Sequence, residues 1–277
     1  MLTILDGPMG TELAARGLDT PLPQWSAQAL VDAPQVVAAI HRDYAAAGAN
    51  MHTANTFRTQ PRKRPGDWGT LARRAVVIAR ASVPRGHRIA ASIAPLEDCY
   101  RPDLSPLDPR NEFRELALLL ASTGIVDVLL CESFANVREA SVACEEAART
   151  GIETWASLTA GPDGDLLTPG ALGEAARVCR ASGARAVLVN CVAASRTRAY
   201  VEALAKVGPP FGAYANAGAE SERIGWRRDE GRGPEAYAAF ARDWITAGAT
   251  IIGSCCGTGP EHIGAVARLA AEMSAED

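Results

Sequence analysis

Eight short apolar segments that resemble β-strands alternate along the chain with longer segments of helical periodicity. The strand-like segments are residues 2–6, 50–55, 89–95, 126–132, 153–159, 186–191, 211–216 and 250–255. Between them, apolar residues recur every three or four positions, as Val37, Ile40 and Tyr44 do before Gly48. This alternation is typical of βα units with a parallel sheet, and no linker-like segment divides the eight units. We therefore expect residues 1–277 to form one α/β domain, a single (β/α)₈ TIM barrel, in preference to two doubly wound halves.

The ends of the helical segments carry signals of their own. Asn136 followed by Glu139 predicts a capping box, Thr70 and Ser195 are predicted N-caps, and Pro260 suits a first helical position. Glycine, which adopts the left-handed conformation most easily, follows six helical segments, at Gly48, Gly124, Gly151, Gly183, Gly208 and Gly248.

Composition excludes several classes of protein. The 277 residues are 48% hydrophobic with a net charge of −4, and no basic stretch exceeds Arg62-Lys63-Arg64, so we expect no nucleic-acid partner. Polar residues interrupt every apolar run before the roughly 20 residues needed to cross a bilayer, so we expect no membrane segment. The seven cysteines are an odd number, and the first residues do not resemble a signal peptide. These features favour a cytoplasmic location, where thiols stay reduced.

Two adjacent cysteines, Cys255 and Cys256, lie between Gly253 and Gly257 at the end of the last apolar run. Neighbouring residues of a regular strand point to opposite faces, so both thiols can reach one metal ion only if the strand ends or bends there. Gly253 and Gly257 are predicted to permit that bend. A catalytic zinc takes three protein ligands and leaves a fourth position for substrate. Cys191, at the end of the sixth run, is the best third ligand. Burial as small apolar residues is the alternative for these cysteines, and it is the one we adopt for Cys99, Cys131, Cys144 and Cys179.

Polar residues end most of the predicted strands, which is the rim where TIM barrels carry their active sites. Asp6 and Glu132 end the first and fourth strands and would face the same mouth as the three thiols. Together they suggest recognition of a cationic group on the substrate. Taken singly, Asp6 could cap a turn and Glu132 could pair with a nearby arginine.

The chain resembles the zinc-dependent homocysteine S-methyltransferases over almost its whole length. The matching stretches are residues 5–13, 54–57, 130–134, 190–191, 214–218 and 253–263. The resemblance implies a (β/α)₈ barrel with Zn²⁺ held by Cys191, Cys255 and Cys256. It also implies that Asp6 and Glu132 bind the amino group of homocysteine.

By the same resemblance, we expect backbone N–H groups near Gly7 and Gly10 to meet the substrate carboxylate, and Asn216 to bind substrate as well. Pro8, Ala215 and Ser254 depart from the commoner family residues, and none of them is a predicted ligand or carboxylate.

The implied reaction transfers a methyl group from a sulfonium donor, S-methylmethionine or S-adenosylmethionine, to the thiol of L-homocysteine and gives methionine. Zinc would deprotonate that thiol, because only the thiolate attacks a methyl group well. Residues 57–69 and 97–110 are the predicted donor side, with Tyr100 and Trp226 as candidate contacts to a cationic donor. Betaine or another donor on the same site, a non-catalytic zinc- or thiol-binding barrel, and a lyase or hydrolase using zinc-bound water are the alternatives. The last would need a general base, and no histidine is placed for that role or as a ligand.

Overall fold

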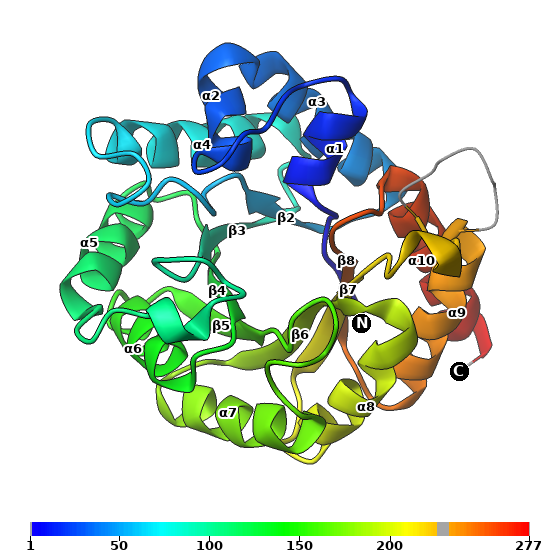
Figure 1. Ribbon diagram of the computed structural model, residues 1–277. Helices are drawn as coiled ribbons and strands as arrows, with labels where there is room; N and C mark the ends of the chain where they lie inside the picture. Colours follow the sequence, from blue (N-terminus) through cyan, green and yellow to red (C-terminus); the bar gives the residue numbers. More distant parts are fainter. Residues whose placement is uncertain (1, 226–232, 277) are drawn as a thin grey trace.

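Eight parallel strands form one sheet in the order β1-β8-β7-β6-β5-β4-β3-β2. This computed structural model describes residues 2–225 and 233–276. The strands are β1 (Thr3–Ile4), β2 (Met51–Ala54), β3 (Arg88–Ile93), β4 (Val128–Phe134), β5 (Glu153–Leu158), β6 (Ala186–Ala193), β7 (Phe211–Asn216) and β8 (Ile251–Ser254). An isolated parallel bridge between Leu5 and Met51 joins β1 to β2, so the sheet closes on itself (Figure 1). The predicted (β/α)₈ barrel is confirmed.

The helices form a ring around the strands (Figure 1). The α-helices are α1 (Met9–Ala15), α2 (Ala29–Asp32), α3 (Pro34–Ala47), α4 (Trp68–Ser82), α5 (Arg110–Ala121), α6 (Val137–Ala148), α7 (Pro169–Ala181), α8 (Ala194–Ala205), α9 (Gly233–Thr246) and α10 (Pro260–Glu276). In the part of the chain that the structure describes, three short 3₁₀ helices lie in loops: η1 (Trp25–Gln28), η2 (Pro102–Leu104) and η3 (Glu220–Glu222). No helix within the described residues is long and apolar enough to cross a membrane.

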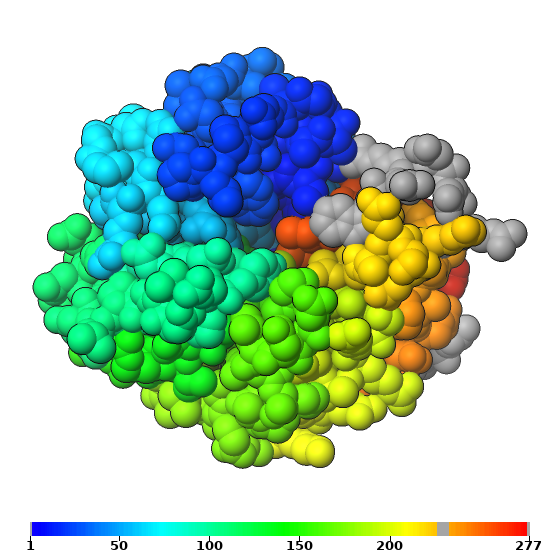
Figure 2. Space-filling view, in the orientation of Figure 1, coloured from blue at the N-terminus to red at the C-terminus, as the bar shows by residue number. Residues whose placement is uncertain are grey.

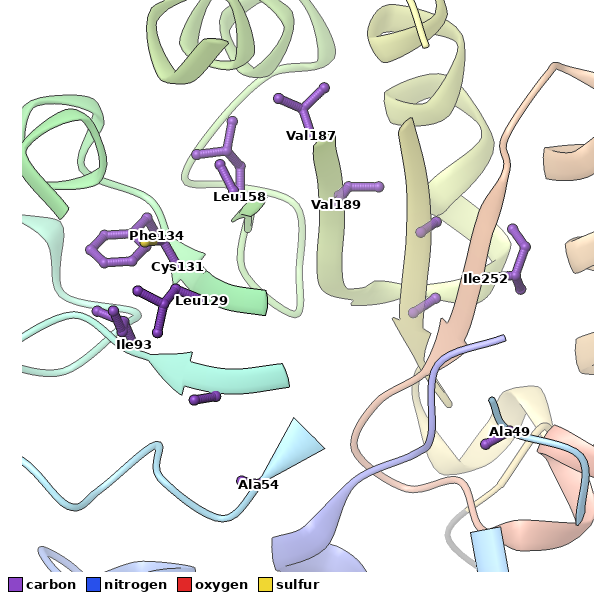
Figure 3. Packing of buried hydrophobic residues seen from close by; sticks show 14 of the residues in the cluster. Ala49, Ala54, Ile93, Leu129, Cys131, Phe134, Leu158, Val187, Val189 and Ile252 are labelled. Atoms are coloured by element: carbon purple, nitrogen blue, oxygen red, sulfur yellow. The ribbon is translucent and has the colours of Figure 1, made fainter. Parts of the chain in front are cut away.

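Alternation along the strands divides the core into two layers. In β4, Val128 and Leu130 belong to the cluster inside the barrel, whereas Leu129 and Cys131 belong to the larger cluster between strands and helices. Figure 3 shows side chains of the outer cluster, including Phe134 and Val187, directed from the strands toward the surrounding helices. Since the period of a strand is two, the same alternation directs Glu132 inward, above Leu130.

The helix ends only partly follow the predictions. All six predicted glycines have positive φ, from 67° to 110°, and α10 begins at Pro260. The Asn136 side chain accepts the Glu139 N–H at 3.1 Å, but the Glu139 carboxylate accepts the Leu96 N–H instead of completing a capping box. The other two N-cap predictions were wrong, for Thr70 and Ser195. Thr70 lies inside α4, and β6 runs into α8 so directly that Ser195 is already helical.

Candidate metal centre and active site

A cavity of about 300 Å³ opens at the C-terminal ends of the strands. Its lining includes all five residues predicted from strand ends to share one mouth: Asp6, Glu132, Cys191, Cys255 and Cys256. In the space-filling view, the blue N-terminal segment and the blue-green residues near 100 crowd over this end of the barrel (Figure 2). The cavity therefore brings thiols and carboxyl groups together in one space beneath these segments.

A bulge in β6 turns Cys191 into the cavity. Leu188 faces the barrel interior and Val189 the helices, so a regular strand would direct Asn190 inward and Cys191 outward. The register between β6 and β7 shifts between Asn190 and Ala193, and Cys191 has a φ of 55°. A non-glycine residue in this left-handed region is strained, and such strain concentrates at functional sites. The bulge thus brings Cys191 to the same side as Asn190.

The cysteine pair lies just beyond the end of β8. The strand stops at Ser254, so Cys255 and Cys256 belong to a turn and are freed from strand alternation, as predicted. Gly257, with a φ of 83°, makes the bend. Gly253 has another role: a Cβ there would lie 2.6 Å from the Leu5 Cβ, so glycine lets β8 approach β1 closely.

The three thiols fit a soft metal ion. Their Sγ atoms all lie within 4.8 Å of one another. The Cys191–Cys255 and Cys255–Cys256 sulfur distances are 2.7 and 4.0 Å, both longer than the roughly 2.05 Å of a disulfide. Hydrogen bonding to its two neighbours, together with burial, raises the pKa of the Cys255 thiol well above its ordinary value. Three crowded thiols cannot all ionise without a cation, and a divalent metal with sulfur preference supplies the required charge.

Asp6 and Glu132 are buried carboxyl groups, and among residues 2–225 and 233–276 no lysine or arginine side chain forms an ion pair with either of them. Asp6 accepts the Thr53 N–H at 2.9 Å, and Glu132 accepts the Tyr214 hydroxyl at 2.8 Å. Burial raises the pKa of Asp6 well above its ordinary value, and it raises the pKa of Glu132 to about 7. Neither the Thr53 N–H nor the Tyr214 hydroxyl carries a positive charge, so a cationic group on a ligand is the natural partner for this pair of carboxyl groups.

Two histidines near Asp6 do not neutralise its carboxylate. One ring nitrogen of His41 on α3, one of His52 on β2 and a carboxylate oxygen of Asp6 all lie within 4.8 Å of one another. Burial lowers the pKa of His41 to about 4 and of His52 to about 3. Both rings are therefore neutral at pH 7, and the Asp6 carboxylate gains no counter-charge from them.

The side chains of Asn190 and Asn216 hold the strand ends near Cys191 in place. Asn190 accepts the Ser157 hydroxyl at 2.7 Å and donates to the Ser133 hydroxyl at 2.7 Å, which ties β4, β5 and β6 together. Asn216 donates to the Cys191 carbonyl at 3.1 Å and accepts the Gly218 N–H at 2.8 Å. Asn216 was expected to bind substrate, but its amide is engaged by backbone and it is not among the residues lining the cavity.

Residues from three loops line the mouth of the cavity. Tyr100 and Arg58 from the two predicted donor loops line the cavity, and Gly7 and Gly10 line it near Asp6. Trp226 lies outside the described residues. Trp25, in the segment before α2, was not anticipated, because an aromatic residue in a polar loop gives no periodic signal. Its ring is 5.7 Å from that of Phe57 in an edge-on arrangement.

Comparison with known proteins agrees with this geometry. The family model described as homocysteine S-methyltransferase matches residues 3–270. Homocysteine S-methyltransferase 4 from Zea mays is 29% identical over 99% of this chain and 91% of its own length. Homocysteine S-methyltransferase from Escherichia coli (strain K12) is 28% identical over 96% and 94%.

Among solved structures, the metallated form of the homocysteine methyltransferase MmuM from Escherichia coli has the same fold. Its TM-score is 0.79 with 24% identity, and the match covers 96% of each chain. Because the family model covers nearly the whole barrel, the chain belongs to the homocysteine S-methyltransferase family of enzymes.

Proposed function

We propose that residues 1–277 act as one homocysteine-binding barrel that uses Zn²⁺ to transfer a methyl group from a sulfonium donor to L-homocysteine, giving methionine. The donor in this proposal is S-methylmethionine or S-adenosylmethionine. The observation that carries the proposal is the meeting of three thiols and two unneutralised carboxyl groups in one cavity. A thiol-bearing amine is complementary to both sets of groups.

Cys191, Cys255 and Cys256 would hold the metal. Bound zinc would supply the positive charge that favours the thiolate form of the substrate thiol. Asp6 and Glu132 bind the substrate ammonium, and backbone N–H groups of the turn at Gly7 bind its carboxylate. Asn216 acts indirectly, by holding the Cys191 carbonyl.

Methyl transfer requires little more of the protein than alignment. A bond forms between the acceptor sulfur and the methyl carbon while the bond between that carbon and the donor sulfur breaks. The bonding electron pair stays on the donor sulfur, which leaves as a neutral thioether, and the acceptor thiol proton passes to solvent. Since a sulfonium leaves without protonation, no general acid is needed. Loops that close the mouth around Tyr100 and Trp25 would hold the reacting atoms in line and limit access of water.

The test measures zinc and methyl transfer on the same sample. Homocysteine deuterated at its methylene groups is incubated separately with S-methylmethionine, S-adenosylmethionine, betaine and methyl-folate, and deuterated methionine is measured by mass spectrometry. The deuterium is needed because S-methylmethionine itself becomes unlabelled methionine. One zinc per chain and labelled product with a sulfonium support the proposal. Labelled product with betaine or methyl-folate alone contradicts the donor assignment, and zinc without any product indicates a non-catalytic barrel.

A further inference from the structure

Arg58 is a buried cation in the wall of the cavity. It lies in the loop between β2 and α4, is 9% exposed, and lines the cavity. Its Nη1 donates to the Glu97 carbonyl at 3.3 Å, and its buried Nε has no hydrogen-bond partner. The Glu97 carboxylate is engaged elsewhere, with Arg62 and Lys63. Within residues 2–225 and 233–276, no carboxylate forms an ion pair with Arg58.

A buried guanidinium without an anion is unfavourable, because desolvation of the charge is not offset by an opposite charge. The surrounding residues nevertheless fix it in place. Its Cζ lies 5.1 Å from the centroid of the Phe57 ring, and Trp25 packs edge-on against that ring. The planar guanidinium offers two parallel N–H donors, the geometry that suits a carboxylate. Arg58 is therefore held ready for an anionic ligand group.

The place of Arg58 in the cavity favours the donor over the acceptor as the source of that anion. Asp6, Glu132 and the three thiols all come from the ends of strands β1, β4, β6 and β8, or from the residue or two beyond. Arg58 comes instead from a loop over the mouth, in company with Tyr100 and Cys99 from the loop after β3.

We propose that Arg58 binds the carboxylate of the methyl donor and makes the enzyme selective for donors that carry one. This inference rests on the proposed function. The donor methyl group must lie against the acceptor sulfur, and Arg58 then holds the far end of the donor under the mouth loops. A sulfonium without a carboxylate leaves the guanidinium unpaired and binds more weakly.

The experiment compares S-methylmethionine with its decarboxylated counterpart, (3-aminopropyl)dimethylsulfonium, in zinc-loaded wild type, Arg58→Gln and Arg58→Lys. For the wild type we expect kcat/KM to be about 10- to 100-fold higher with S-methylmethionine, the value of a charge-assisted hydrogen-bonded pair. In Arg58→Gln this preference disappears, because only the reaction of the carboxylate-bearing donor slows. Arg58→Lys keeps the positive charge but lacks the two parallel N–H groups of a guanidinium, so we expect an intermediate preference for S-methylmethionine. The KM for homocysteine stays unchanged in both variants.

Arg101→Gln is the matched control. Arg101 lies on the loop after β3, is exposed, and pairs with Asp103 away from the cavity lining, so its loss leaves the preference intact. If kcat/KM in Arg58→Gln falls equally with both donors, the substitution has damaged the structure in general, and the inference is overturned. A raised KM for homocysteine in Arg58→Gln would also overturn the inference, because it would mean that Arg58 binds the carboxylate of homocysteine and not that of the donor.

If the wild type transfers no methyl group from either of these two sulfoniums, the role of Arg58 is decided by binding, and the proposed function fails if S-adenosylmethionine gives no product either. Calorimetry with the same two sulfoniums then replaces turnover. Wild-type binding that favours S-methylmethionine, with the preference lost in Arg58→Gln, supports the inference, and equal binding of both compounds refutes it.

Discussion

Replacing Glu132 by glutamine should stabilise the metal-free protein at alkaline pH while weakening its binding of homocysteine. The substitution keeps the shape of the side chain and an oxygen that can accept the Tyr214 hydroxyl, which lies 2.8 Å from the Glu132 carboxylate. It removes only the charge that burial disfavours. A group that reduces stability but supports ligand binding is the expected signature of a functional residue.

The magnitude follows from the pKa of Glu132. Burial raises it from 4.5 to about 7, so ionisation in the folded protein costs about 3 kcal/mol more than in the unfolded chain, at about 1.36 kcal/mol per pH unit. Because the folded-state pKa is the higher one, Glu132 takes nothing from stability below about pH 4.5, and its destabilising contribution grows as the pH rises to about 7. Glutamine does not titrate. The variant should therefore match the wild type near pH 4.5 and exceed it by up to about 3 kcal/mol at pH 8.

Urea denaturation and thermal melting of chelator-treated, reduced protein at pH 5 and pH 8 would measure this difference. A gain of about 3 kcal/mol corresponds to roughly 6 °C in melting temperature for a chain of this size. On zinc-loaded protein, calorimetry should show homocysteine affinity reduced by about 10- to 100-fold, the effect of losing a hydrogen bond to a charged group.

Glu146→Gln is a control with the opposite sign. The Glu146 carboxylate is also buried, but it is paired with Arg110, Arg114 and Arg149. Although burial acts against it, these arginines lower the pKa of Glu146, so its loss should destabilise the protein at neutral pH. If Glu132→Gln proved less stable than the wild type at pH 8, the argument that Glu132 lacks a counter-charge would be refuted.

Three further predictions concern the metal, the acid range and the barrel. Cys191→Ser should lose both bound zinc, measured by mass spectrometry, and methyl transfer. Cys144→Ala, outside the cavity, should keep both. Full zinc content in Cys191→Ser would contradict the ligand assignment. Burial lowers the pKa of His52 to about 3, below its unfolded value of about 6.5, so wild-type stability should fall with pH below 6.5. His52→Gln should flatten that fall in melting temperature, and an unchanged slope would exclude His52 as a cause. Gly212→Ala should sharply lower the melting temperature, since its Cβ would clash with the backbone of β8, while Gly170→Ala, in open space on α7, should not.

Two glycines also illustrate how local signals differ in what they predict. The sequence predicts a bend at Gly257, and the positive φ of 83° confirms it. The same prediction for Gly253 is wrong, because Gly253 lies within strand β8, and its lack of a side chain makes room for Leu5 beside β1. A backbone turn leaves a local mark in the sequence, but close approach between strands distant in the chain does not.

The sequence by itself determined the eight βα units, the inward direction of Glu132 and the position of the thiols at strand ends. These features depend on periodicity and on residue types at element boundaries, which are local properties. Only the tertiary structure decided that a bulge turns Cys191 into the cavity, that Tyr214 meets Glu132 across the barrel, and that Arg58 is buried with no ion pair to a carboxylate of the described residues. Each of these depends on which distant segments closure of the barrel brings together, and pairing over such distances is set by the packing of the whole sheet.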